Sequence, residues 1–221
     1  RTVAMDVVER YDVKNPRLAS LFLARCMASS GRELSVNKVY NEFKSRQISV
    51  SRNTLSDLLE YYEDAYLLFS VPEFTRSLAN NMRSASKVYA VDPAMFGAFS
   101  PASALDHGQR LETAVFNALR RRTPAVRPSS VCRLLIKDKN KSHEVDFVAG
   151  DALLMQAYGL IQVSVDMTSE KTRECEIAAL DAAMAQFDLG ESVIVTMDEQ
   201  ADIPCKHGVV HAVPAWKWLL S

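Results

Sequence analysis

Apolar residues in the first hundred positions recur at intervals of three and four, which is the spacing of one face of an α-helix. The pattern predicts three helices, whose ends are marked by residues that favour helix termini: Asn15-Pro16, Gly31, Ser35 and Ser51. Two strand-like runs follow, at residues 66–71 and 87–91. Three helices followed by a hairpin are the order of a winged helix-turn-helix, so we expect that fold here.

The second half of the chain alternates between short apolar runs and amphipathic stretches. These predict two helices and five strands: helices at 106–122 and 169–187, and strands at 130–136, 144–149, 159–165, 192–196 and 209–213. The order indicates an α/β (α+β) domain. A small, polar segment precedes it, so we expect a helical, winged-helix domain at 1–98 and an α/β domain at 99–221.

Charge is distributed unevenly along the chain. The net charge of −1 argues against a dedicated polyanion-binding protein. Residues 1–52, however, carry ten Lys and Arg side chains against five Asp and Glu, whereas residues 53–100 carry three against six. The basic first quarter indicates either nucleic-acid contact or a solvated helical surface.

Candidate DNA contacts lie on the second and third predicted helices: Lys38, Lys44, Arg46, Arg52 and Asn53. An Arg and an Asn in the first turn of the third helix suit phosphate and base-edge contacts. The acidic run from Asp57 to Asp64 would repel a phosphate backbone if it faced one.

No apolar stretch reaches the roughly 18 residues that a membrane span needs, and no signal peptide is recognisable, so we expect a cytoplasmic protein without membrane contact. The four cysteines form no CxxC pair, which argues against a zinc site or a disulfide framework. His207 and His211 flank a strand-like run, where a spacing of four does not bring two imidazoles together. The first residues fall inside an amphipathic pattern and lack an initiator Met, which we interpret as a piece of a longer protein.

An acidic group in the second half has the spacing of a nuclease-like metal site. Glu112 lies on a predicted helix, Asp146 lies two residues after Glu144 on a strand, and Gln162 and Ser164 share one face of the next strand. In restriction-endonuclease-like cores, carboxylates hold Mg²⁺ and a Lys beyond the last acid assists the attacking water. Gln162 is neutral and Ser164 is no ammonium group. The alternative is that Glu112 is a solvated helix residue and Asp146 a charge at a strand edge.

Several segments, in order, resemble the C-terminal region of a prokaryotic family of AAA-type ATPases, which carries a domain of unknown function. They cover nearly the whole chain: 35–41, 50–55, 59–67, 87–93, 111–116, 144–148 and 161–164. The resemblance implies a winged helix followed by a PD-(D/E)XK restriction-endonuclease-like fold. It places Glu112, Asp146 and Gln162 at metal-binding positions, and Ser164 at the position of the catalytic Lys.

The resemblance also implies an N-terminal ATP-binding domain as a partner. No glycine in this sequence precedes a Lys, so there is no phosphate-binding loop, and ATP with its Mg²⁺ would bind outside it. We therefore expect no cofactor here beyond a vestigial Mg²⁺ site at Glu112 and Asp146.

Three functions remain open from the sequence. The first is a non-catalytic region of an ATPase that binds DNA or a protein partner. The second is a Mg²⁺-dependent DNA nuclease, in which Lys137 or Lys171 would replace the missing catalytic Lys. The third is a pure protein-interaction module, for example one half of a toxin–antitoxin or stress system.

Overall fold

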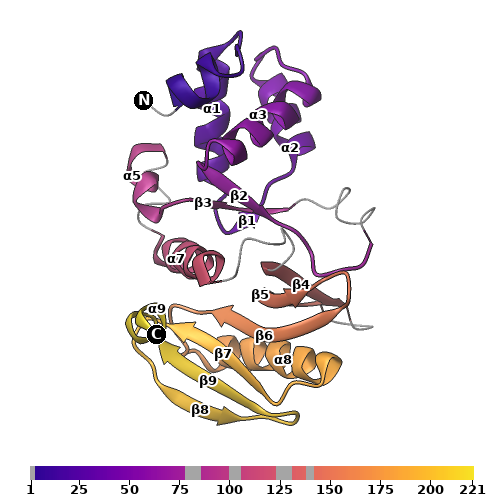
Figure 1. Cartoon of the computed structure of the whole chain (residues 1–221). Coiled ribbons are helices and arrows are strands. Elements are labelled where there is room, and N and C mark those ends of the chain that lie inside the picture. The colour runs from indigo at the N-terminus through magenta and orange to yellow at the C-terminus, as the bar shows by residue number, and fades with distance from the viewer. Residues whose placement is uncertain (1–2, 78–85, 100–105, 123–130, 138–141) are drawn as a thin grey trace. The chain divides into compact units, whose positions relative to one another are not determined.

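The computed structural model of the chain describes residues 3–77, 86–99, 106–122, 131–137 and 142–221 (Figure 1). Within these ranges the protein is a mixed α+β structure with two separate sheets, which confirms the predicted fold class. One compact unit comprises Arg1–Ser70 and Ala85–Asp106, and the other comprises Val71–Ser84 and His107–Ser221. The sequence placed a single boundary between residues 98 and 99. In the structure the first unit continues to Asp106, and the segment that begins at Val71 groups with the second unit.

The helices of the first unit begin where the sequence predicts, because a side chain caps each N-terminus. They are α1 (Pro16–Met27), α2 (Val36–Ser45) and α3 (Arg52–Asp64). The side-chain oxygens of Asn15, Ser35 and Ser51 accept hydrogen bonds from backbone N–H groups in the first turn, at 3.0, 3.3 and 3.0 Å. Such caps satisfy N–H groups that have no partner within the helix.

Three shorter elements complete the helical part of this unit: a π-helical turn η1 (Val3–Glu9), a 3₁₀ turn η2 (Pro93–Met95) and a one-turn helix α5 (Phe96–Phe99). The sequence pattern predicted none of these three.

The prediction that α1 ends at Gly31 is wrong. The helix ends at Met27, and Gly31 turns the chain with a φ of 72°. Its backbone N–H then donates to the Val88 carbonyl at 2.8 Å, which brings the next residues into a sheet. This short strand β1 (Arg32–Glu33) pairs antiparallel with β3 (Lys87–Ala90), and β2 (Leu68–Val71) completes the order β1-β3-β2. A two-residue strand made of charged residues carries no apolar signal of its own.

Buried aromatic rings hold the helices of the first unit together. Phe22 of α1 contacts Phe43 of α2 edge-on, with ring centroids 6.4 Å apart, and lies 5.9 Å from the ring of Tyr62 on α3. The Tyr62 hydroxyl donates to the Ala19 carbonyl at 2.6 Å. Burial also raises the pKa of Tyr62, so the hydroxyl remains a donor. One cluster thus joins all three helices.

The second unit is built on a sheet of order β4-β5-β6-β7-β9-β8. Its strands are β4 (Val131–Lys137), β5 (Ser142–Asp151), β6 (Gln156–Val163), β7 (Glu191–Thr196), β8 (Ala201–Pro204) and β9 (Val209–Pro214). Strands β4, β5 and β6 pair antiparallel with one another. Strand β7 pairs parallel with both β6 and β9, and the edge strand β8 pairs antiparallel with β9. In Figure 1 the strands of this sheet are coloured in chain order from reddish orange at β4 to yellow at β9.

Three helices accompany the sheet: α7 (His107–Arg122), α8 (Glu170–Phe187) and α9 (Ala215–Leu220). The long helix α8 connects the parallel strands β6 and β7, as a parallel pair requires. The predicted helices and strands of this half agree with the structure to within three residues at each end, whereas β8 and α9 were not predicted. No helix among the described residues is both long and apolar enough to cross a bilayer.

The turn between β8 and β9 approaches the end of α8 closely enough to require glycine. A Cβ added at Gly208 would lie 2.1 Å from the carbonyl oxygen of Gly190, whereas a Cβ at Gly190 would meet nothing within 4 Å. The Val209 N–H donates to that same carbonyl at 2.9 Å, so the oxygen cannot move away without loss of a hydrogen bond.

We therefore expect Gly208→Ala to lower the free energy of unfolding by about 1–3 kcal/mol through overpacking. The matched variant Gly190→Ala should change it by less than about 1 kcal/mol. Urea unfolding followed by circular dichroism measures both. Equal effects of the two substitutions would contradict the close approach.

Candidate functional site

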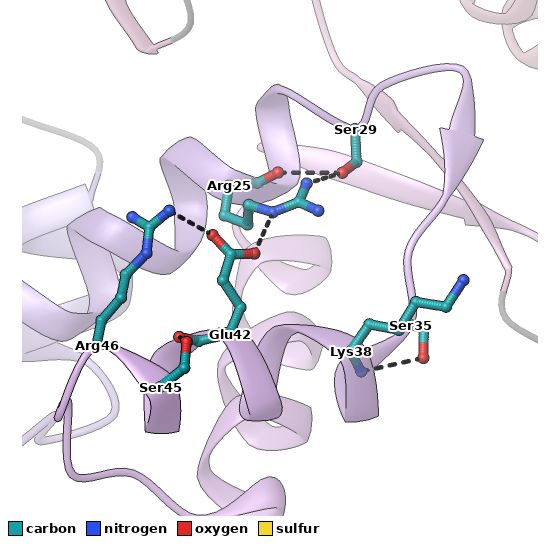
Figure 2. A network of polar contacts seen from close by, with 7 residues as sticks. All are labelled: Arg25, Ser29, Ser35, Lys38, Glu42, Ser45 and Arg46. Carbon is teal, nitrogen blue, oxygen red and sulfur yellow. Dashed lines mark hydrogen bonds and ion pairs between the residues drawn. The ribbon is translucent and has the colours of Figure 1, made fainter.

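Glu42 of α2 lies at the centre of a polar network in the first unit (Figure 2). One carboxylate oxygen accepts a hydrogen bond from Arg25 Nε of α1, and the other pairs with the Arg46 guanidinium, both at 3.1 Å. Arg25 also donates to the hydroxyl of Ser29. Because Glu42 offsets part of the charge of both arginines, Arg46 presents less positive charge to solvent than its sequence position indicates.

A second group of predicted DNA contacts lies on another side of α2. The guanidinium of Arg52, the first residue of α3, lies over the Tyr40 ring at 4.6 Å from its centroid. Lys44 follows Tyr40 by one helical turn, on the same side of α2. Asn53 is the next residue of α3 and is exposed. Arg52, Lys44 and Asn53 therefore share one surface.

Lys38 is exposed and lies one turn before Glu42, whereas Lys44 lies one turn after Tyr40. The structure thus divides the predicted contacts into two groups: Lys38 with Arg46, and Lys44 with Arg52 and Asn53. Glu42 and Arg25 are seventeen positions apart and meet only through the packing of α1 on α2, so the sequence alone does not show that Arg46 shares a carboxylate with another arginine.

Beyond its first turn, α3 presents carboxylates to solvent. Its buried residues are Leu55, Leu58 and Tyr62, and the opposite side carries exposed Asp57, Glu60 and Asp64. A phosphate backbone that faced this side of α3 would be repelled. Only the N-terminal turn of α3 suits an anionic partner.

Gln162 is the centre of the candidate site in the second unit. Its side-chain oxygen accepts the backbone N–H of Asp146 at 3.0 Å, and its Nε2 donates to Glu176 Oε2 of α8 at 2.6 Å. The amide cannot be turned over, since a backbone N–H needs an acceptor and a carboxylate needs a donor. Gln162 is only 6% exposed, so both ends of a buried amide are satisfied within the fold.

Asp146 lies beside Gln162 because it is one position beyond the Phe147↔Ile161 pair of β5 and β6, and it also lies in a β-bulge between β4 and β5. Between β4 and β5 the register passes from Cys132↔Val148 to Leu134↔Val145, so one residue of β4 faces two residues of β5, Asp146 and Phe147. Bulges of this kind redirect side chains and occur often beside functional sites. Asp146, 8% exposed, accepts the backbone N–H of Val163 on Oδ2 at 3.1 Å.

The other predicted positions are Glu112, Ser164 and Glu144, which lie on α7, after β6 and on β5. Glu112 is half-buried on α7, one turn before Phe116, whose ring stacks with that of Phe147 at 6.1 Å. The Ser164 hydroxyl donates to the Asp166 carbonyl at 3.3 Å, within a turn after β6. Glu144 is half-buried opposite Leu135 in the β4–β5 pair.

Glu176 of α8 contacts Gln162 and was not among the residues predicted from the sequence. Its signal was weak but present, because Glu176 precedes the buried Leu180 by one helical turn and so lies on the sheet-facing side of α8.

The donor set does not match a catalytic Mg²⁺ site. Throughout the described part of the chain, no three His, Cys, Asp or Glu side chains are arranged to hold a metal ion. The oxygen of Gln162 and one oxygen of Asp146 are already engaged by backbone N–H groups. Magnesium prefers charged carboxylate oxygens in near-octahedral geometry. Asp146 and Glu112 remain the carboxylates that the sequence proposed for a vestigial site.

The two histidines around β9 have separate partners. His207 Nδ1 lies 3.1 Å from Asp181 Oδ2, and His211 Nδ1 lies 2.7 Å from Asp202 Oδ1. Burial alone would raise the pKa of the Asp181 carboxyl, but hydrogen bonds from His207 and the Cys205 thiol outweigh it and hold the pKa below its usual value. Burial and Asp181 raise the pKa of the Cys205 thiol, which disfavours the nucleophilic thiolate. The contact between His207 and Asp181 connects the β8–β9 turn to α8, whereas the contact between His211 and Asp202 joins β9 to β8.

Replacement of Gln162 by Glu tests the hydrogen-bonded chain. Two carboxylates would face each other across the present 2.6 Å contact, so one would have to stay protonated. A carboxyl whose folded-state pKa is raised destabilises the fold as pH rises above the unfolded value of about 4.3. We expect Gln162→Glu to cost little below that pH and about 1–3 kcal/mol at pH 7.

Urea unfolding at several pH values measures this effect. The matched control is Gln156→Glu at the start of the same strand, where Gln156 is exposed and accepts the Tyr158 hydroxyl. A cost for Gln162→Glu that is independent of pH would contradict the proximity of the two carboxylates.

Comparison with known proteins identifies relatives but no activity. Residues 1–106 match a family described as "Domain of unknown function (DUF8612)". The chain is 31% identical over 222 aligned positions to "Uncharacterized protein MJ1544" of Methanocaldococcus jannaschii, covering 98% of this chain and 47% of that protein. It is 23% identical over 150 positions to an "Uncharacterized protein" of Haemophilus influenzae, covering 68% of this chain and 35% of that one. The chain thus spans less than half the length of these curated relatives. No solved structure matches it.

Proposed function

We propose that this chain is the C-terminal, non-cleaving region of an AAA-type ATPase, in which a winged helix and a restriction-endonuclease-like unit bind other macromolecules. The observation that carries the non-cleaving role is the buried Gln162 amide, held between the Asp146 N–H and the Glu176 carboxylate. A position that would supply charge to a metal in an active nuclease instead supplies two structural hydrogen bonds.

The order of elements in the first unit supports a winged helix. Helix α1, strand β1, helices α2 and α3, and strands β2 and β3 follow one another, and β3 lies between β1 and β2 in the sheet. A helix-turn-helix pair followed by a small sheet is the arrangement of that fold.

The order of the second unit supports a nuclease-like core. A helix with Glu112 precedes three antiparallel strands, and a helix then connects to the parallel strand β7. Asp146 and Gln162 lie on the second and third of these strands and are hydrogen-bonded. The family resemblance supplies the correspondence of these positions to a nuclease.

Two features argue against cleavage by this unit. Gln162 supplies no negative charge, and the Ser164 hydroxyl is used within a local turn and carries no positive charge. Lys171, one candidate replacement, is exposed in the first turn of α8. The side chain of Lys137, the other candidate, lies outside the described residues.

The first unit is better suited to a protein partner than to a DNA groove, because the exposed side of α3 carries Asp57, Glu60 and Asp64. The second candidate is DNA, favoured by the surface of Lys44, Arg52 and Asn53.

ATP with Mg²⁺ would bind a domain outside this sequence, and the relatives are more than twice as long as their match to this chain. A cytoplasmic location is part of the proposal. A phosphate-binding loop before Arg1 in the full protein would support the ATPase assignment, and its absence would contradict it.

A plasmid-nicking assay with Mg²⁺ or Mn²⁺ tests the non-cleaving role. We expect no nicked or linear product above the level of Asp146→Ala, because loss of one electrostatic contact with the transition state costs about 10²–10³ in rate, and two positions are altered here. Cleavage that disappears in Asp146→Ala would show a live nuclease and would refute this part of the proposal.

Duplex binding by the first unit should be weak and independent of sequence, with a dissociation constant of about 10⁻⁴–10⁻⁶ M. Each lost phosphate contact should reduce the salt slope of log K by about 0.9. We expect Arg52→Gln to have this effect and Arg46→Gln to have a smaller one, because Glu42 offsets Arg46. Fluorescence anisotropy at several salt concentrations measures the slopes. Affinity that is unchanged when Arg46 and Arg52 both become Glu would leave only the protein partner.

A further inference from the structure

A basic and aromatic surface of the second unit is formed where α9 contacts the end of α7. We call it the α7–α9 patch, and its residues are Arg121, Arg122, Trp216, Lys217 and Trp218. The residues come from segments 94 or more positions apart in the sequence, and no motif of the sequence analysis includes them. The fold alone brings them together.

Arg122 is held in place by Trp218. Its guanidinium donates to the Trp218 carbonyl at 2.7 Å and lies over the Trp218 ring at 4.3 Å from the centroid. A guanidinium fixed in this way loses less side-chain entropy when it binds a ligand. Arg122 is also exposed, so the guanidinium remains accessible to a ligand.

Within the described part of the chain, the cations of the patch have neutral hydrogen-bond partners. Arg121 Nε donates to the Asn117 carbonyl at 3.0 Å, and Lys217 Nζ donates to the Gln200 side-chain oxygen at 3.4 Å, both neutral acceptors. Among the residues that the structure describes, no Asp or Glu forms an ion pair with Arg121, Arg122 or Lys217. This differs from Arg25 and Arg46 of the first unit, which share Glu42.

Trp216 adds an exposed aromatic ring to α9, which also carries Lys217 and Trp218. It is 63% exposed, although large aromatic side chains usually bury most of their surface. Exposed indoles next to Arg and Lys are the combination with which single-strand-binding proteins stack bases and hold the backbone.

We propose that the α7–α9 patch binds single-stranded nucleic acid. Trp216 stacks on a base, the guanidinium of Arg122 stacks on a neighbouring base, and Arg121 and Lys217 contact phosphates. This inference concerns the second unit alone and does not depend on the proposed winged helix.

Nucleic acid fits the patch better than the other anionic partners. The bases of a single strand stack on flat aromatic rings and guanidinium groups. An acidic protein segment would bind through the positive charges and the apolar area alone. Leu219 and Leu220 at the end of α9 are also exposed, which favours protein or lipid. The guanidinium held on the Trp218 ring and the exposed Trp216 indole both suit base stacking, and therefore decide the choice.

Fluorescence anisotropy with a labelled oligo-deoxythymidylate longer than a site of about 4–16 nucleotides tests the proposal on the whole chain. We expect salt-sensitive binding that Trp216→Ala weakens about tenfold. The double variant Arg121→Gln with Lys217→Gln should reduce the salt slope of log K by about 1.4, since each phosphate contact contributes about 0.7 for a single strand. All three side chains are exposed, so the variants should fold.

Two matched controls lie elsewhere in the same unit. Tyr158→Ala removes an equally exposed aromatic ring, 67% exposed, and Lys206→Gln removes a cation from the β8–β9 turn, at the other end of β9 from α9. Both should bind as the wild type does.

Three results would overturn the proposal. The first is that no oligonucleotide binding is detected at low salt. The second is that the patch variants and the control variants lose the same amount of affinity for the oligonucleotide. The third is that polyglutamate or phosphatidylglycerol vesicles bind the patch more tightly than the oligonucleotide does. The last result would assign the patch to an acidic protein or a membrane surface.

Discussion

The second unit depends on one buried amide. Gln162 joins β5 through the Asp146 N–H and joins α8 through Glu176, so strand, neighbouring strand and crossover helix meet at one side chain. Asp146 in turn binds the backbone N–H of Val163 beside it. A buried polar group costs free energy unless its hydrogen bonds are complete, and here each bond completes another. The group therefore specifies one arrangement of the bulged strand, its neighbour and the helix.

The same arrangement explains why a nuclease-like order of residues need not mean cleavage. A carboxylate at position 162 would bring charge to a metal, but it would also repel Glu176. An amide satisfies both neighbours without a metal or a proton. Under the proposed non-cleaving role, Asp146 and Glu112 are the carboxylates that remain, and Asp146 accepts a hydrogen bond from the backbone of β6.

Charge is used differently in the two units. In the first, Glu42 offsets Arg25 and Arg46, and the exposed side of α3 is acidic. In the second, Arg121, Arg122 and Lys217 have neutral partners. The net charge of −1 conceals this contrast, because opposite charges that are averaged over the sequence are separated in space. Recognition of an anionic ligand follows from local potential rather than from net charge.

The helices, most strands and the α+β class could be predicted from the sequence, because periodicity and capping residues such as Ser35 and Ser51 act over a few positions. Strand alternation also put Asp146 on the same face as Glu144, and Gln162 on the same face as Ser164, since alternation is local. The fold was needed to show that Gly31 enters a sheet, that Glu42 pairs with Arg46, that Glu176 reaches Gln162, and that Arg122 lies on Trp218. Each of these depends on the packing of distant segments, and charged side chains on short or exposed elements carry no periodic signal of their partners.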